Sequence, residues 1–98
     1  MSRQLMVLIF EPAPGSEPRV DELLRSARRR AGQAGWHCWA YRNEINPSEL
    51  MLFIEGPEPE PGGPAAPVFG DEIGGIRALS RRFDTVRALT EYALDDEP

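Results

Sequence analysis

Two stretches of this 98-residue chain are apolar on both sides of an expected β-strand. Residues 4–10 read QLMVLIF, and residues 50–55 read LMLFIE. Because side chains alternate between the two faces along a strand, both segments present large apolar groups to both faces of their sheet. A sheet built from such strands must be covered on both sides. This requirement limits the folds that the chain can adopt more than any other feature.

Apolar residues recur at helical spacing in two further segments. A first helix is expected to begin after Ser16, a suitable N-cap, and to end at Gly32 or Gly35. A second helix is expected to begin at Asp71 and to continue as far as Ala93. The apolar stripe of this second helix, which allows a break near residues 84–85, consists of Ile73, Ile76, Leu79, Phe83, Val86, Leu89 and Ala93.

Residues 36–43 are expected to form the second strand in chain order, joined to the third strand at 50–55 by a hairpin because turn-forming residues lie between them. The element order β-α-β-β-α predicts a single α+β domain over residues 1–98, ferredoxin-like, with an antiparallel sheet and both helices on one face. Residues 57–70 are expected to form an exposed proline-rich loop, and the acidic tail 95–98 to fray. No further strand is recognised after the second helix.

Two helices on one face leave roughly six large apolar side chains on the other face of the sheet. Exposing them would forgo on the order of 10 kcal/mol, at about 1.5–3 kcal/mol for each side chain. A second copy of the chain can cover this face, because one patch serves both partners about a twofold axis. The sequence therefore predicts a homodimer, packed sheet against sheet as in a dimeric α+β barrel.

Composition excludes several classes of function. The net charge of −5 argues against nucleic acid as a partner, because binding to phosphates needs a basic face. No apolar run is long enough to span a membrane and no secretion signal is recognised, so a cytoplasmic protein is expected. The chain has one cysteine and one histidine, adjacent in sequence, and these do not supply the three or four converging ligands of a metal site. No metal or cofactor is expected.

The segment 35–41, GWHCWAY, contains most of the rare side chains of the sequence. Small Cys38 and Ala40 would allow a helix to approach, so that side is assigned to the helices and Cys38 to a buried structural thiol. His37, Trp39 and Tyr41 then face the partner copy, although the opposite facing stays open until the register is known. The residues expected to line a pocket there are Phe10, Trp39, Tyr41, Met51 and Phe53, near Met6, with Arg42 at the mouth.

The chemistry of this pocket has alternative interpretations. His37 could act as a general base, but no carboxylate lies at an obvious spacing, and a packing role is more common for a single histidine on a strand. Trp39 and Tyr41 could stack on a ligand or form the core of a dimer interface. Arg42 could bind an anionic ligand, or it could form a salt bridge with Glu44 or Glu55.

Several features combine in a resemblance to a known family. They are the first apolar strand, Gly35 before the second strand, the hairpin sequence RNEINP at 42–47, which is similar to an Arg-Ser-x-x-(Asp/Asn)-Pro pattern, and the helix after the third strand. Together they resemble the antibiotic biosynthesis monooxygenase-like proteins of the dimeric α+β barrel superfamily. The resemblance implies a dimer whose paired sheets enclose a pocket. It also implies oxidation of phenolic or quinol-type compounds without a cofactor, or, as in other members, haem degradation.

The chain departs from that family at two positions. Glu55 is followed by Gly56 where the family commonly has Glu-Trp, and residues 79–81 lack the histidine that often lies on the family's second helix. Two hypotheses of function therefore stand. One is a cofactor-independent monooxygenase acting on an aromatic small molecule beside His37. The other is a non-catalytic dimeric module that binds a ligand or a protein.

Overall fold

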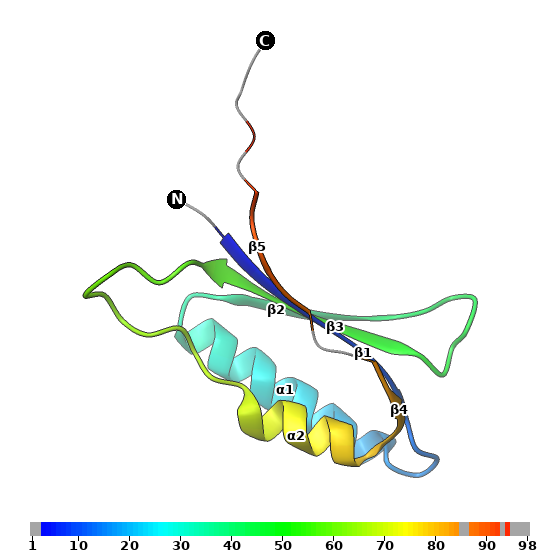
Figure 1. Ribbon diagram of the computed structural model, residues 1–98. Coiled ribbons are helices and arrows are strands. Elements are labelled where there is room, and N and C mark those ends of the chain that lie inside the picture. Colours follow the sequence, from blue (N-terminus) through cyan, green and yellow to red (C-terminus); the bar gives the residue numbers. More distant parts are fainter. Residues whose placement is uncertain (1–2, 85–86, 93, 95–98) are drawn as a thin grey trace.

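The computed structural model describes residues 3–84, 87–92 and 94, and in this part of the chain one antiparallel sheet of five strands carries two helices. The helices α1 and α2 lie on the same face of the sheet (Figure 1). Neither of these described helices is long and apolar enough to span a membrane. The elements are β1 (Arg3–Pro12), α1 (Glu17–Gln33), β2 (His37–Arg42), β3 (Leu50–Pro57), α2 (Gly70–Ala78), β4 (Ser80–Phe83) and β5 (Arg87–Thr90). The predicted α+β, ferredoxin-like fold is confirmed.

Strand β1 is central to the sheet, whose order is β2-β3-β1-β4. It pairs with β3 on one edge and with β4 and β5 on the other. In the β1–β3 pair Leu8 lies opposite Leu52, and residues directly opposite each other in antiparallel strands point to the same face. The even-numbered residues of both strands therefore face the helices.

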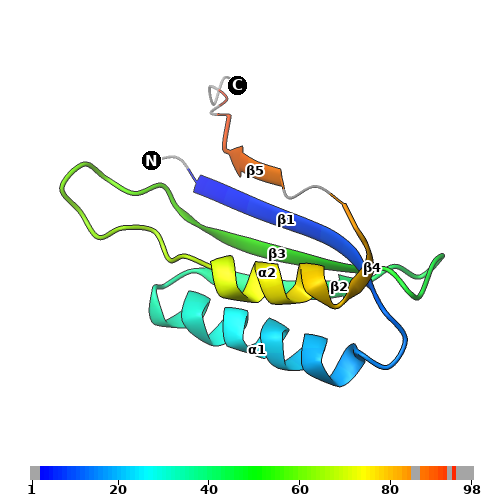
Figure 2. The ribbon, with the colours of Figure 1, turned by 60° about the horizontal axis from the view of Figure 1, so that its bottom comes forward.

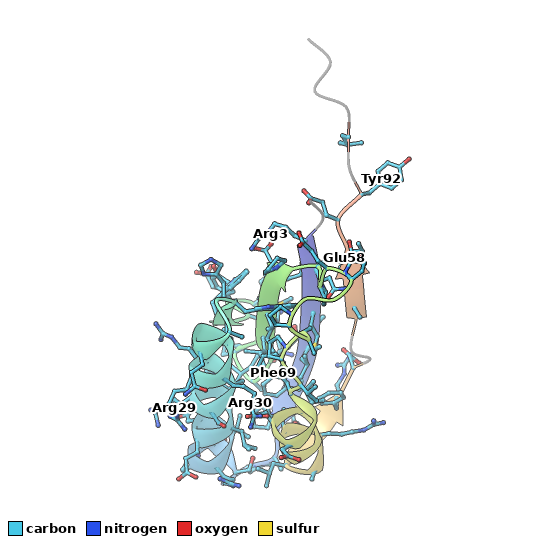
Figure 3. All side chains as sticks on the ribbon, turned by 90° about the vertical axis from the view of Figure 1, so that its left-hand side faces the viewer. Arg3, Arg29, Arg30, Glu58, Phe69 and Tyr92 are labelled. Atoms are coloured by element: carbon cyan, nitrogen blue, oxygen red, sulfur yellow. The ribbon has the colours of Figure 1, made fainter. Side chains whose placement is uncertain are left out.

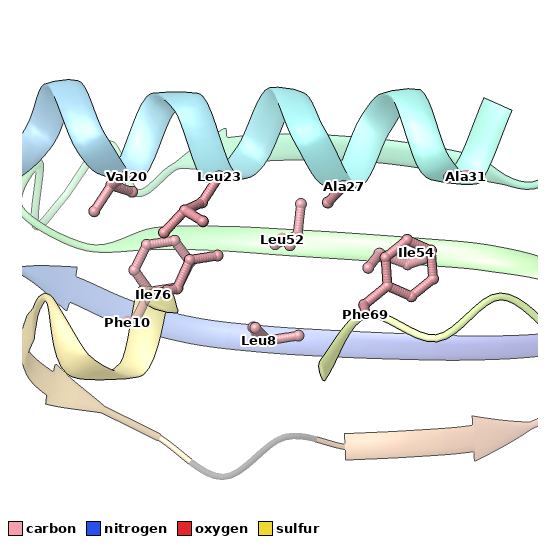
Figure 4. Packing of buried hydrophobic residues seen from close by; sticks show 10 residues of the cluster. All are labelled: Leu8, Phe10, Val20, Leu23, Ala27, Ala31, Leu52, Ile54, Phe69 and Ile76. Atoms are coloured by element: carbon pink, nitrogen blue, oxygen red, sulfur yellow. The ribbon is translucent and has the colours of Figure 1, made fainter. Parts of the chain in front are cut away.

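The core lies between this face of the sheet and the helices (Figure 4). Helix α1 contributes residues at a spacing of three or four, as an amphipathic helix should. Phe69, at the beginning of α2, fills one end of the core and is 3% exposed. The buried apolar residues are Leu8, Phe10, Val20, Leu23, Ala27, Ala31, Leu52, Ile54, Phe69 and Ile76.

The prediction of a long second helix is wrong. Helix α2 ends at Ala78, and the chain turns back along the outer edge of β1, so that Phe83 lies in β4 and Leu89 in β5. Without this pairing the outer edge of β1 would keep its backbone N–H and C=O groups unpaired, which is unfavourable at a sheet edge. A fourth strand position therefore exists, filled by two short strands in succession, whereas Val86 and Ala93 lie outside the described residues.

A buried carboxylate joins the two helices, which lie side by side (Figure 2). Ser26 Oγ donates a hydrogen bond of 2.8 Å to Glu72 Oε2, and Arg30 Nε donates one of 3.2 Å to the same oxygen. Figure 3 shows Arg30 on the side of α1 that faces α2. Burial alone would raise the pKa of Glu72, but the hydrogen bonds from Ser26 and Arg30 and the positive charge of Arg30 lower it below its ordinary value.

Strand β3 passes very close to Trp36. A Cβ atom added to Gly56 would lie 1.9 Å from Cδ2 of the Trp36 indole, so the aromatic ring rests directly on the glycine backbone. This contact explains why Gly56 follows Glu55 in a position that faces the helices, where a side chain would displace the indole.

We expect Gly56→Ala to destabilise the protein by about 1–3 kcal/mol, because the added methyl group overlaps the Trp36 ring. Gly32→Ala is the matched control. Nothing lies within 4 Å of its added Cβ, and alanine is favoured over glycine in a helix, so it should be neutral or stabilising by up to about 1 kcal/mol. Urea unfolding measures both free energies, and equal stability of the two variants would contradict the close packing of Trp36.

The lowered pKa of Glu72 has a defined effect on stability. Its charged form is favoured in the folded state, so the contribution is complete well above the ordinary pKa of 4.5 and is lost as the pH falls through the folded value. We expect Glu72→Gln to be less stable than the wild type at pH 7 and the difference to shrink as the pH falls below 4.5.

Urea unfolding at several pH values measures this difference. Glu22→Gln is the control, because Glu22 belongs to an exposed ion pair with Arg19 and should change stability little at any pH. A stability difference for Glu72→Gln that does not depend on pH would contradict the assignment.

Candidate functional site

The sheet face opposite α1 and α2 carries no helix of the described chain (Figure 1). We call it the open face. The register places three rows of directly opposed residues there, each running from β1 through β3 to β2. These rows are Leu5, Glu55 and His37; Val7, Phe53 and Trp39; and Ile9, Met51 and Tyr41. None of these residues belongs to the buried core, and most of the apolar ones are only half-buried.

Aromatic rings form a cluster at the middle of the open face. The rings of Trp39 and Phe53 are stacked, with centroids 5.6 Å apart and an angle of 11° between their planes. Tyr41 contacts Phe53 edge-on, at 5.7 Å and 80°. Tyr41 keeps 59% of its surface exposed. The cluster therefore offers an apolar aromatic surface with one phenolic hydroxyl at its border, a combination common in small-molecule sites.

One end of the open face is polar. His37 is directly opposite Glu55, and Cβ atoms of such pairs lie about 4.5–5.5 Å apart. Arg3 Nη2 donates a hydrogen bond of 3.1 Å to Glu55 Oε1. A histidine beside a carboxylate is the arrangement in which an imidazole can accept a proton while the carboxylate orients it. These three residues place an imidazole, a carboxylate and a guanidinium beside the aromatic cluster.

Sequence reasoning missed the carboxylate beside His37. Glu55 is 18 positions further along the chain, and only the pairing of β2 with β3 brings it opposite His37. The hairpin itself contained the information needed to find this pair. Arg42 pairs with Leu50, and each step back along β2 is matched by one step forward along β3, which brings His37 opposite Glu55. A prediction of this register would have placed Glu55 in the site.

The structure confirms that His37, Trp39, Tyr41, Met51 and Phe53 lie on one face, but it corrects the placement of Phe10 and Met6. Phe10 is 1% exposed and belongs to the core under the helices, and Met6 packs against the same core. The reason is register: Phe10 lies opposite Leu50, whereas Met51 and Phe53 lie opposite Ile9 and Val7. Ile9 and Val7 thus occupy the positions expected for Phe10 and Met6.

Arg42 is also not at the mouth of the open face. It lies opposite Leu50, on the helix side of the sheet, and lines a hollow there with Glu17 and Asp21 of α1. Its Nη1 donates a hydrogen bond to the carbonyl oxygen of Pro47 within the hairpin. Arg42 therefore stabilises the turn, and the expected partner Glu55 binds Arg3 instead.

Cys38 points away from the open face and packs against the core, as expected for a structural thiol. Burial raises the pKa of this thiol, and the charge of Arg28 only partly opposes the effect. A raised pKa keeps the thiol protonated near neutral pH and lowers its nucleophilicity. Among the residues that the structure describes, no three His, Cys, Asp or Glu side chains converge as metal ligands.

Three solved structures are similar to this chain over nearly its whole length. Rv0793 from Mycobacterium tuberculosis superposes with a TM-score of 0.63 at 15% identity, covering 98% of this chain and 99% of that one. A candidate antibiotic biosynthesis monooxygenase from Chloroflexus aurantiacus gives 0.60 at 12% identity, covering 95% and 96%. A second such candidate, from Bordetella bronchiseptica, gives 0.60 at 13% identity, covering 96% and 99%.

The chain has the fold of the antibiotic biosynthesis monooxygenase-like proteins. At 12–15% identity the likeness to these structures concerns the fold alone. No model of a known protein family matches the sequence, and no curated protein matches it. The site must therefore be interpreted from its own residues.

Proposed function

We propose that the protein is a homodimer whose two open faces pack against each other and enclose a pocket for a planar aromatic small molecule. The observation that carries the proposal is the aromatic cluster of Trp39, Phe53 and Tyr41 in the middle of a sheet face that no helix of the described chain covers. An apolar face of this kind is unfavourable in water unless something covers it.

A second copy of the chain is the simplest cover. The open face is apolar in the middle, through Val7, Phe53 and Met51, and polar at one end, through His37, Glu55 and Arg3. In a twofold dimer the same patch of both copies forms the interface, so the apolar middle of one open face can pack against the apolar middle of the other. Two twisted sheets with large aromatic side chains between them leave room for a flat ligand that stacks on the rings.

The reaction that suits this pocket is the oxidation of a phenolic ligand. His37, which lies opposite Glu55, would accept the phenolic proton, and the electron-rich phenolate would react with molecular oxygen. Oxidation of a phenol to a quinone consumes one O₂ per ring: one oxygen atom becomes the new carbonyl oxygen and the other leaves as water. No metal or organic cofactor is needed for this balance. Two of the similar structures are candidate antibiotic biosynthesis monooxygenases, which supports this class of reaction.

A non-catalytic dimeric module is the second candidate. The rings of Trp39 and Tyr41 both contact the ring of Phe53 already, so the three would form a stable interface without a ligand. This candidate predicts a closed interface, whereas the enzyme needs an open pocket next to His37.

Sedimentation equilibrium tests the dimer. We expect the wild type to be dimeric at micromolar concentration and Val7→Glu to be monomeric, because the substitution places a charge at the middle of the open face. Val68→Glu is the control and should remain dimeric, since Val68 is 74% exposed in the proline-rich loop. A wild type that stays monomeric would remove the enclosed pocket.

Oxygen uptake with 1-naphthol tests the reaction. We expect conversion to 1,4-naphthoquinone with one O₂ consumed per molecule, and a loss of about 10²–10⁴-fold in rate for His37→Gln, the usual contribution of a general base. Binding of 1-naphthol, followed by calorimetry, should change little in that variant. Binding without oxygen uptake in the wild type would favour the module, and absence of both would contradict the aromatic pocket.

A further inference from the structure

A separate hollow lies away from the open face, where the proline-rich loop folds over the end of α1 and the beginning of β2. Its volume is about 510 Å³. Small-molecule pockets commonly have volumes of about 300–1,000 Å³, so an organic ligand can fit. The hollow is lined by Gln33, Ala34, Trp36, Pro57, Glu58, Pro59, Glu60, Gly63, Pro64, Ala65, Ala66 and Pro67.

Trp36 gives this hollow a fixed aromatic wall. The same indole that rests on the backbone of Gly56 lines the hollow, and it also packs against the core. Because a side chain at position 56 would overlap the ring, the glycine is what lets the indole occupy this place. An indole held in this way is a preorganised surface with a negative electrostatic potential over its face.

The charges around the hollow have one sign. Glu58 and Glu60 supply two carboxylates from the loop, where Figure 3 shows Glu58. Although the chain has eleven arginines, none is among the described residues that line the hollow, and no ion pair within the described ranges involves either glutamate. The C-terminal end of α1 adds partial negative charge, since Gln33 is the last residue of that helix.

The conformation of the proline-rich loop is restricted. Its prolines restrict the backbone, and a tight turn at its tip is closed by a 2.9 Å hydrogen bond from Gly63 N to Glu60 O. Gly62 adopts a φ of 78° in this turn, a conformation that glycine accepts readily. Binding to such a loop costs less ordering entropy than binding to a flexible one.

We propose that this hollow binds an organic cation, an amine or quaternary ammonium group carried on an apolar body. The indole of Trp36 attracts the cation through its face, Glu58 and Glu60 pair with its charge, and the prolines and alanines contact the apolar part. This function is independent of the open face, because Trp36 and Trp39 lie on opposite sides of the sheet. The negative charge and potential of these groups would not increase the affinity for a neutral or anionic ligand.

Nuclear magnetic resonance of the two indole N–H groups tests the proposal with three probes of one skeleton: 4-phenylbutylammonium, 4-phenylbutan-1-ol and 4-phenylbutanoate. We expect the ammonium probe to shift the Trp36 signal. It should bind about fivefold more tightly than the alcohol, because its charge forms partly exposed ion pairs with Glu58 and Glu60. The carboxylate probe should bind more weakly than the alcohol. Added salt should reduce the affinity for the ammonium probe only.

The double variant Glu58→Gln/Glu60→Gln should lower the affinity for the ammonium probe toward that for the alcohol, and the affinity for the alcohol should not change. Glu44→Gln, at an exposed position in the hairpin, is the matched control and should behave as the wild type. Equal binding of the three probes, or an unchanged affinity in the double variant, would overturn the proposal. A shift confined to Trp39 would also overturn it, because it would place the probe on the open face.

Discussion

The pairing of β1 with β3 is the interaction on which the rest of the structure depends. Both strands carry large apolar side chains in every position of their central parts, so alternation alone cannot say which side chains are buried. The register decides it by placing Leu8 opposite Leu52 under the helices and Val7 opposite Phe53 on the other face. A slip by one residue would exchange the core for the open face. The core, the aromatic cluster and the polar end all follow from this one alignment.

The sequence was sufficient wherever a local pattern decided the structure. The first helix, the hairpin and the three strands were predicted close to their observed bounds, because periodicity, caps and turn residues act over a few positions. Alternation within β2 likewise placed His37, Trp39 and Tyr41 on one face. The helix-side assignment of Cys38 was correct for the same reason, since a small side chain suits the side on which α1 packs.

Prediction failed where two distant segments had to be aligned. Phe10 was placed in the site because neither strand sequence alone determines which residues of β1 lie opposite which residues of β3. Glu55 was overlooked beside His37 for the same reason. The second helix was extended too far because the spacing of Leu79, Phe83 and Leu89 fits a helical stripe, whereas the unpaired edge of β1 favours strands there. In each case a contact between remote residues decided the outcome.

The pairing of β5 with β1 also affects how the chain folds. Gln4 lies opposite Thr90, which is 86 positions further along the chain, so this edge of β1 stays unpaired until a distant segment reaches it. Such distant contacts slow folding, and an apolar strand with an unpaired edge is prone to aggregate during the delay. By closing this edge, β5 protects the apolar strand β1 from pairing with the strand of another molecule.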